Sequence, residues 1–269
     1  MTELVLIRGG GDLASGVALR LFRSGYKVVI VELPEPLAVR RMVAFSEAVY
    51  SGKITVEGVT AKLSNMTQVQ AVLDAGNIPI LIDPDARILL DLEFTAVVDA
   101  RLIKKEPGPI PKDIPLHIGL GPGFRAGHNC HAVIETKRGH YLGRVIWEGS
   151  SLPDSGQPEG DPNRVLRAPV DGQVICHAEI GTFVEKGGLI AEVISPLNSN
   201  HYPVTAPIKG VLRGLIHPGL QVSSGLKIGD IDPRDDREAC YLVSDKALAI
   251  GGGVLEAILS KSRGRAHLG

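Results

Sequence analysis

The amino-terminal part of the chain alternates short apolar runs with helical stripes. An apolar run at residues 4–7, a glycine-rich turn, an amphipathic stripe and an apolar run at 28–31 predict a strand, a helix and a second strand. The same alternation predicts a helix at 66–73, a strand at 78–82, a short helix at 86–92 and a strand at 96–98. Strands that alternate with helices are typical of parallel sheets with right-handed crossovers, so we predict at least four parallel strands.

After residue 115 the pattern becomes one of short strands. Residues 131–135 and 141–146 predict a β-hairpin that turns at Arg138-Gly139. The stretch 149–162 is rich in Ser, Pro, Gly and Asp, which is typical of a linker. Near the carboxyl terminus we expect a strand at 241–243 and two helical pieces at 245–250 and 254–260, separated by Gly251-Gly252-Gly253.

Between the linker and this terminal region the sequence repeats itself. The segment APVDGQVICHAEIGTFVEKGGLIAEVI begins at Ala168, and the related segment APIKGVLRGLIHPGLQVSSGLKIGDID begins at Ala206. Aligned without a gap, Gly172 coincides with Gly210, and further glycines, a proline and apolar residues also fall in register. Neither half could bury its apolar face alone, so we predict one compact barrel of two equivalent halves.

Charge and hydropathy exclude several classes of protein. The 29 Lys and Arg residues nearly balance the 30 Asp and Glu residues, so a net charge of -1 gives no long-range attraction to nucleic acid or to an acidic membrane. The first residues include Glu3 and lack the basic region of a signal peptide, and no run of about 18 residues is apolar throughout. We therefore expect a cytoplasmic protein with no nucleic-acid or membrane partner, and a homo-oligomer is left open.

The cysteines offer one candidate for chemistry. Cys130 lies between His128 and His131, whereas Cys176 and Cys240 stand alone, and no CxxC pair occurs. A metal site needs three or four converging ligands, so the pattern favours a polar loop that leads into a strand, and we predict no metal. A site completed by residues from elsewhere in the fold remains open.

A glycine-rich loop follows the first strand and opens the first helix. Residues 9–16 read GGGDLASG and fit the pattern G-x-G-x-x-A. Glycines let the backbone approach a pyrophosphate, whose charge is met by free N–H groups and the positive end of the helix. Glu32 ends the second strand, near the spacing expected for an acid that accepts from a ribose hydroxyl. The candidate ligand-binding residues here are Gly9, Gly10, Gly11, Asp12, Gly16 and Glu32. The alternative is a turn that only packs the helix on the sheet.

Two further loops leave the predicted carboxyl ends of strands, where ligands of open α/β sheets bind. One holds Asp99 and Arg101, whose guanidinium could clamp a phosphate. The other, with Gly119, Gly121 and Gly123, is either a nest for an anion or a plain turn.

Weaker candidates are Asp83-Pro84, after another predicted strand, and the glycines at 251–253. No Ser-His-Asp arrangement or HExxH pattern can be found from spacing, and no general base stands out. Catalytic residues are therefore unknown, and whether the chain is an enzyme is left open.

The repeated segment 168–232 resembles biotinyl and lipoyl domains, whose two quasi-symmetric halves form a barrel-sandwich hybrid. Such domains carry their modified lysine in the hairpin between the halves. The corresponding residues here, 195–202, read SPLNSNHY and contain no lysine. The resemblance therefore implies a module without biotin or lipoate that is structural or provides a docking surface.

The chain as a whole resembles the YqeB family of selenium-dependent molybdenum hydroxylase system proteins, which are thought to be related to XdhC-type maturation factors. The matching stretches include IRGGGDLASG from Ile7, VRRMVAFSEAVYSG from Val39, VDARL from Val98, IGLGPG from Ile118 and SDKALAIGGGV from Ser244. The resemblance implies an accessory role in maturing molybdenum hydroxylases, with the apo-enzyme or other maturation proteins as partners. It implies no particular reaction.

Together these patterns predict an α/β plus β protein, in which a Rossmann-like parallel-sheet domain carries an inserted barrel-sandwich hybrid module. The predicted domains are residues 1–163, 164–235 and 236–269, the last being a strand and helix that return to the main domain. The leading hypothesis is a maturation factor that binds a nucleotide-bearing ligand, such as the dinucleotide form of the molybdenum cofactor. An NAD-dependent oxidoreductase and a non-catalytic docking scaffold are the alternatives, and the cofactor is left unknown.

Overall fold

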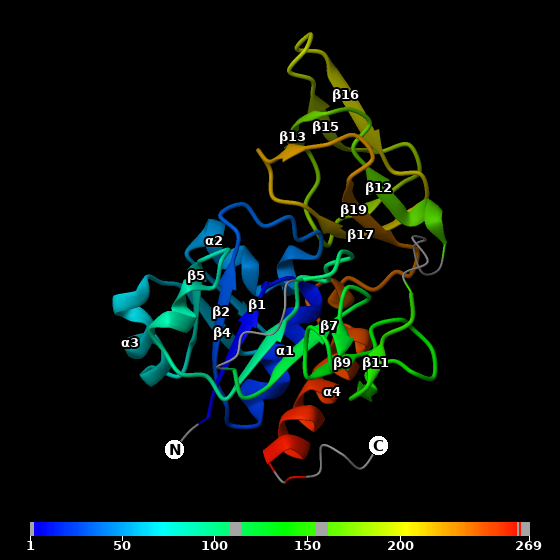
Figure 1. Cartoon of the computed structure of the whole chain (residues 1–269). Coiled ribbons are helices and arrows are strands. Elements are labelled where there is room, and N and C mark those ends of the chain that lie inside the picture. Colours follow the sequence, from blue (N-terminus) through cyan, green and yellow to red (C-terminus); the bar gives the residue numbers. More distant parts are fainter. Residues whose placement is uncertain (1–2, 108–113, 154–160, 263, 265–269) are drawn as a thin grey trace. The chain divides into compact units, whose positions relative to one another are not determined.

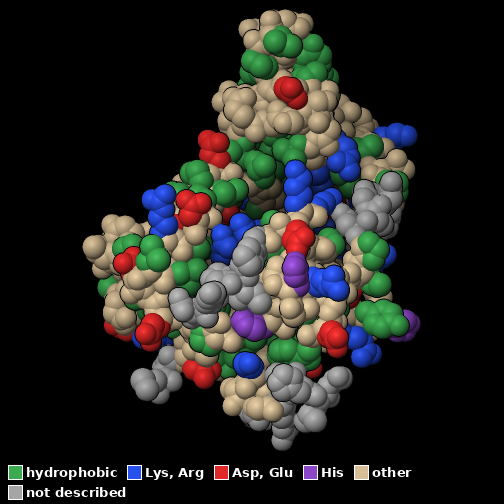
Figure 2. All heavy atoms as spheres, in the orientation of Figure 1, with side chains coloured by type: hydrophobic (Ala, Val, Ile, Leu, Met, Phe, Trp, Pro, Cys, Tyr) green, Lys and Arg blue, Asp and Glu red, His purple; other side chains and the backbone are tan. Residues whose placement is uncertain are grey.

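The computed structural model describes residues 3–107, 114–153, 161–262 and 264, so the middle of the predicted linker lies outside the described residues. The chain forms two compact units (Figure 1). Unit 1 comprises Met1–Pro36, Ala44–Gly156 and Val243–Gly269, and unit 2 comprises Leu37–Val43 and Gln157–Leu242. Figure 2 shows basic and acidic side chains interspersed over the face in view. Among the described residues, no helix is both long and apolar enough to cross a membrane.

Unit 1 is built on a nine-stranded sheet in the order β10-β9-β7-β6-β1-β2-β5-β4-β3. Its strands are β1 (Leu4–Arg8), β2 (Lys27–Glu32), β3 (Lys53–Val56), β4 (Val59–Leu63), β5 (Ile78–Ile82), β6 (Ala96–Asp99), β7 (His117–Leu120), β9 (Ala132–Ile134) and β10 (Val145–Ile146). A separate two-stranded sheet pairs β8 (Arg125–Ala126) with β11 (Gly149–Ser150). The α-helices are α1 (Asp12–Arg23), α2 (Ala48–Ser51), α3 (Val69–Asp74) and α4 (Asp245–Ser262).

The opening strand, helix and strand of unit 1 are confirmed. β1 pairs in parallel with β2, and α1 connects them. The apolar stripe of α1 explains its packing, because Val17 and Leu21 are fully buried while Arg23 at its end stays exposed. The predicted strands at 78–82 and 96–98 are also present, as β5 and β6.

The predicted fold class is wrong for the sheet as a whole. β4, β5, β2, β1, β6, β7 and β9 are parallel neighbours, but the edge strands β3 and β10 are antiparallel. In the described residues, no α-helix lies between β5 and β6, between β6 and β7, or between β7 and β9. Among the described residues of these connections, the 3₁₀ helix Arg87–Leu90 lies between β5 and β6. Unit 1 is therefore a large mixed sheet rather than a Rossmann-like parallel-sheet domain.

The carboxyl-terminal helix corrects a second prediction. α4 is one continuous helix through Gly251, Gly252 and Gly253, so these glycines form no anion nest. A Cβ added to Gly251 would lie 2.6 Å from the carbonyl oxygen of Gly16 in α1, and one added to Gly16 would lie 2.5 Å from the carbonyl of Ala247. The glycines let α1 and α4 pack closely, and this packing outweighs their low helix propensity.

Two further predicted elements differ from the structure, one in length and one in its presence. The hairpin at 131–146 is confirmed, although β9 and β10 are shorter than expected. Residues 241–243, predicted as a strand, form none, and the 3₁₀ helix Glu238–Cys240 precedes them.

Unit 2 holds two four-stranded sheets, ordered β12-β19-β17-β14 and β16-β15-β13-β18. The strands are β12 (Val165–Arg167), β13 (Gly172–Cys176), β14 (Phe183–Val184), β15 (Leu189–Ile194), β16 (His201–Thr205), β17 (Gly210–Leu215), β18 (Gln221–Val222) and β19 (Lys227–Asp232). Short 3₁₀ helices lie at Arg41–Val43 and Pro162–Arg164.

The sequence repeat is expressed in equivalent backbone positions of unit 2. Gly172 opens β13 with a φ of 158°, and its counterpart Gly210 opens β17 with a φ of 155°. A Cβ on Gly172 would lie 2.1 Å from the carbonyl oxygen of Ile194, and one on Gly210 would lie 2.2 Å from that of Asp232. The predicted equivalence of the two glycines is therefore confirmed.

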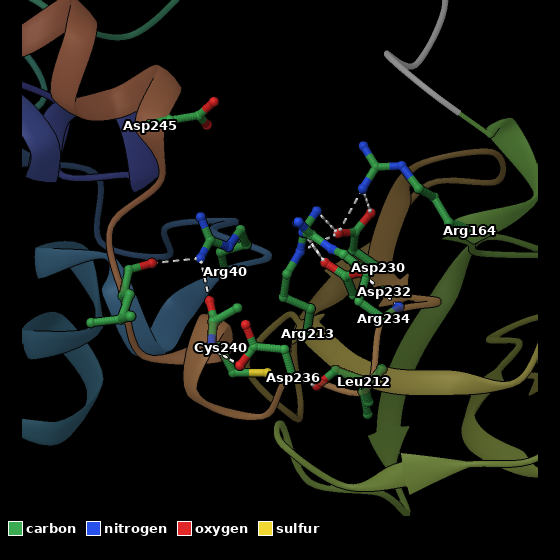
Figure 3. Close-up of polar contacts among 12 residues, drawn as sticks. Arg40, Arg164, Leu212, Arg213, Asp230, Asp232, Arg234, Asp236, Cys240 and Asp245 are labelled. Atoms are coloured by element: carbon green, nitrogen blue, oxygen red, sulfur yellow. Dashed lines mark hydrogen bonds and ion pairs between the residues drawn. The ribbon is translucent and has the colours of Figure 1, made fainter.

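A buried ion-pair network joins β17 and β19 (Figure 3). Its carboxylates are those of Asp230, which is fully buried, and Asp232. Its cations are Arg164, Arg213, Lys227 and Arg234. Arg213 lies at an irregularity in β17 and donates Nε–H to Asp230 over 2.9 Å and Nη1–H to Asp232 over 3.2 Å. The hydrogen bond from Arg234 lowers the pKa of Asp232 to about 2. Every described member has an ionic partner, so neither buried carboxylate is left uncompensated.

Candidate functional site

Charged side chains continue one apolar face of the unit 1 sheet at the carboxyl ends of its strands. The core residues on this face include Leu6, Leu81 and Val97. Side chains alternate between faces along a strand, so residues two positions further on point to the same side. These residues are Arg8, Asp83 and Asp99. The pairing of β1 with β6 places Arg8 directly beside Asp99.

Asp99 is fully buried and lies at the centre of an ion-pair triad with Arg8 and Arg101. Arg101 donates Nε–H to Oδ1 of Asp99 over 2.8 Å and Nη2–H to Oδ2 over 2.5 Å. Nη1 of Arg8 lies 3.5 Å from the same Oδ2 atom. The hydrogen bond to Asp99 raises the pKa of Arg101, whereas burial and repulsion by Arg101 lower the pKa of Arg8. Arg8 is therefore a partly buried cation whose surroundings do not fully compensate its charge.

Two residues of this face hold buried polar atoms without partners. Among the described residues, Nε of Arg8 and both ring nitrogens of His117 have no hydrogen-bond partner. His117 is 5% exposed and lies beside Val97 in the sheet, so its ring points to the face of Asp99. Burial lowers the pKa of His117 to about 4, so the ring is neutral at neutral pH. Each such atom costs roughly 1–3 kcal/mol of stability unless something bonds to it.

A cavity of about 820 Å³ opens at the carboxyl ends of β4 and β5. Its walls include the apolar side chains of Leu63, Met66 and Leu81, together with Asp83 and Pro84. Nη2 of Arg8 lies 3.4 Å from the carbonyl oxygen of Pro84, so the triad adjoins the cavity wall. Cavities of roughly 300–1,000 Å³ suit small molecules, and sheet edges of this kind are common ligand sites.

The glycine loop after β1 bonds to its own strands and to a neighbouring segment. The N–H of Gly10 donates to Oε2 of Glu32 over 2.6 Å, and the N–H of Leu33 donates to Oε1 over 2.8 Å. The carbonyl of Gly10 accepts the N–H of Ser46 over 2.8 Å. Glu32 follows the core residue Val31 directly and therefore points to the opposite face from Arg8. The role predicted for Glu32 with a ribose stays a prediction, and the structure assigns it to the loop.

Packing explains several of the predicted binding glycines. A Cβ on Gly119 would lie 2.1 Å from the ring of Phe124, and one on Gly123 would lie 2.5 Å from the carbonyl oxygen of Ile103. At Gly11, by contrast, an added Cβ meets nothing within 4 Å. The other predicted residues are Gly9 and Gly121, with φ angles of 93° and 97°, Gly16 against α4, and Asp12 at the start of α1.

The side chains near Cys130 in the sequence do not come together as the ligands of a metal ion. Cys130 is fully buried, and burial raises the pKa of its thiol to about 12. Nδ1 of His131 accepts the N–H of His117 over 2.8 Å, and Nε2 of His128 lies 2.5 Å from Oε1 of Glu106. In the part of the chain that the structure describes, no three His, Cys, Asp or Glu residues are arranged to hold a metal ion.

Sequence patterns indicated Asp99 and Arg101 but missed Arg8, His117 and most of the cavity. Arg8 ends an apolar strand, and His117 interrupts the apolar run 116–118. A polar residue within a strand that is buried on both faces is the signal that would have found both. The cavity has no such signal, because it depends on how the loops after β4 and β5 meet.

Comparison with known proteins gives one sequence relative and several weak structural matches. No family model matches the chain. The "Uncharacterized protein YqeB" of Escherichia coli K12 is 45% identical over 262 residues, which cover 96% of this chain and 47% of that protein. The chain thus spans about half the length of this curated relative.

Three of the solved structures that match are an aspartoacylase family protein, an ectoine utilization protein and a succinylglutamate desuccinylase/aspartoacylase. An aspartoacylase family protein from Mesorhizobium loti is 10% identical, with 86% of this chain and 84% of that chain covered and a TM-score of 0.28. The ectoine utilization protein EutE from Ruegeria pomeroyi is 12% identical, with 86% and 58% covered and a TM-score of 0.25. A succinylglutamate desuccinylase/aspartoacylase from Rhodobacter sphaeroides is 16% identical, with 32% and 30% covered and a TM-score of 0.25.

These matches correct the expectations drawn from family resemblance. None of these three structures is described as an XdhC-type factor or as a biotinyl or lipoyl domain. The predicted relation to XdhC-type factors, the biotinyl-like classification of the repeat and the role in maturing molybdenum hydroxylases are wrong on this comparison, and the NAD and scaffold alternatives gain no support. At TM-scores of 0.28 and below, the matches assign no reaction to this chain either.

Proposed function

We propose that unit 1 binds a small organic anion at the carboxyl ends of β1, β5 and β6. The observation that carries the proposal is the state of Arg8, a partly buried cation with a lowered pKa and an Nε–H that has no partner among the described residues. An anion beside this guanidinium would supply both an acceptor and a negative charge. Guanidinium groups bind carboxylates well because their donors match the spacing of the two oxygens.

The cavity favours an organic ligand over a bare inorganic anion. Its walls present Leu63, Met66 and Leu81 to the interior, and burying apolar surface there stabilises a complex by about 25 cal/mol per Å². Because Arg8 contacts the carbonyl of Pro84 in the cavity wall, one molecule could reach both features. A carboxylate with a short apolar chain fits this combination.

The acidic residues at the cavity limit the charge of such a ligand. Oδ2 of Asp83 accepts the N–H of Ile88 over 3.0 Å, and Asp85 pairs with Arg87 at 3.4 Å on the exposed surface. Each carboxylate therefore has its own partner, but both still repel negative charge. A ligand with one anionic group is favoured over a polyanion.

Titration calorimetry with hexanoate tests the proposal. The wild-type chain should bind hexanoate, and Arg8→Gln should bind it roughly 10–100-fold more weakly, as expected for one charge-assisted hydrogen bond of about 1.5–3 kcal/mol. Arg23→Gln is the matched control, because Arg23 pairs with Glu57 elsewhere in unit 1 and should leave binding unchanged. Hexylamine should not bind to any variant. Equal affinity of the wild type and Arg8→Gln for hexanoate, or no binding at all, would refute the proposal.

A further inference from the structure

His117 lies among the charged groups of the unit 1 site without bonding to any of them. His117 pairs with Val97 of the neighbouring strand, two residues before Asp99, so its ring lies on the same face of the sheet as the triad. The ring meets Phe124 edge-on, with 6.1 Å between ring centroids. Neither ring nitrogen has a hydrogen-bond partner among the described residues.

The fold alone would favour an apolar residue at this position. Buried polar groups in native proteins are nearly always hydrogen-bonded, and exceptions indicate strain, chemistry or a missing binding partner. Replacing an unpaired buried polar group by an apolar side chain of similar shape is neutral or stabilising. Packing in unit 1 therefore supplies no reason for an imidazole at residue 117.

The protonation state of the ring indicates what it could bond. A neutral imidazole offers one N–H donor and one acceptor nitrogen, and a hydroxyl group likewise donates one hydrogen bond and accepts others. An ammonium group only donates, and it would be repelled by Arg8 and Arg101. One ligand group reaches only one of the two ring nitrogens, because they point away from each other. A hydroxyl group can bond whichever nitrogen faces it, whereas a ketone oxygen can bond only the nitrogen that carries the proton.

We propose that His117 is the specificity-determining residue of the unit 1 site and hydrogen-bonds a hydroxyl group of the ligand, which is then a hydroxy-carboxylate. This inference rests on the proposed function, because the carboxylate is the group that binds beside Arg8. His117 selects among carboxylates, whereas Arg8 provides the attraction that all of them share.

Three related probes separate these roles. Hexanoate, 2-hydroxyhexanoate and 3-hydroxyhexanoate carry the same charge and chain length and differ in one hydroxyl group. In the wild type, one hydroxylated probe should bind at least about tenfold more tightly than hexanoate, since a site built to bond a hydroxyl rejects an analogue without it. In His117→Leu all three affinities should fall within about twofold of one another, and His117→Gln, which keeps a donor and an acceptor, should restore part of the preference.

Stability gives a readout that a merely structural histidine would not produce. His117→Leu should unfold in urea at the same concentration as the wild type or a higher one, because the leucine leaves no polar atom unpaired. A clear loss of stability would show that the imidazole already has a structural partner and would overturn the inference.

The outcomes distinguish the two proposals. If hexanoate binds through Arg8 but the wild type shows no preference for a hydroxyl, the role of His117 is wrong and the proposed function stands. If the preference for a hydroxyl group persists in His117→Leu, the role of His117 is again wrong and the proposed function stands. If no probe binds to the wild type, the proposed function is wrong and the inference falls with it.

Discussion

Replacing Asp99 by Asn should test the charge balance of the unit 1 site most directly. The side chain of Asp99 is 1% exposed and is the shared partner of Arg8 and Arg101. Asn keeps the shape and one acceptor oxygen but removes the negative charge. The two guanidinium groups would then face each other across a neutral amide.

The exposure of the Arg8 and Arg101 side chains limits the loss of folding stability that Asp99→Asn should cause. Removing one partner of a fully buried ion pair costs roughly 3–5 kcal/mol, because the other charge is left uncompensated. Here the Arg8 and Arg101 side chains keep 21% and 36% of their exposure, so water screens part of the repulsion. We therefore expect a loss near the lower end, about 3 kcal/mol. An added carboxylate should restore part of it by binding beside Arg8.

Urea denaturation with and without hexanoate measures both effects. Asp74→Asn is the control, because Asp74 pairs with Lys27 on the surface at 3.0 Å and should change little. If Asp99→Asn loses no more stability than this control, Asp99 does not compensate the guanidinium groups. If hexanoate stabilises wild type and Asp99→Asn equally, the site gains no affinity for anions when its carboxylate is removed.

Three further predictions concern packing, the repeat and pH. Gly251→Ala should lower stability in urea by about 1–3 kcal/mol, while Gly252→Ala, whose Cβ meets nothing within 4 Å, should raise it by about 0.5–1 kcal/mol; the same sign for both would contradict the close approach of α1 and α4. Gly172→Ala and Gly210→Ala should lower the melting temperature of unit 2 by similar amounts, and clearly unequal shifts would argue against equivalent positions. Between pH 6.5 and 4 the unfolded His117 binds a proton that the buried ring does not, so stability should fall by about 3 kcal/mol as the pH drops through this range, and His117→Leu should lack this loss.

Local pattern predicted the core strands of unit 1 because these strands are buried on both faces and therefore read as continuous apolar runs. It did not predict the antiparallel edges β3 and β10, since strand direction depends on where the connecting loops run. It also divided α4 at its glycines. Gly251 lies against Gly16, and a short stretch of sequence shows neither this contact nor that the packing outweighs the low helix propensity of glycine.

The candidate site was predicted in part, by the rule that loops at the carboxyl ends of parallel strands hold ligands. That rule indicated Asp99 and Arg101. It did not indicate Arg8, because the glycine loop that follows this residue was taken as the ligand-binding element, or His117, which stands at the start of a strand. Both residues are candidates because they hold buried nitrogen atoms without hydrogen-bond partners among the described residues. This property can be recognised only when the positions of the neighbouring residues are known.

A glycine motif is evidence for a ligand only where packing does not already require the glycine. At Gly16, Gly119 and Gly123 an added Cβ would lie 2.5 Å or less from another atom, so the fold alone demands glycine there. Gly11 is the contrasting case within the loop, with open space around an added Cβ, but the loop's neighbouring amide at Gly10 already bonds Glu32. On the other face, no contact among the described residues satisfies Nε of Arg8 or the ring of His117. The ligand is therefore expected beside these two side chains rather than on the glycine loop.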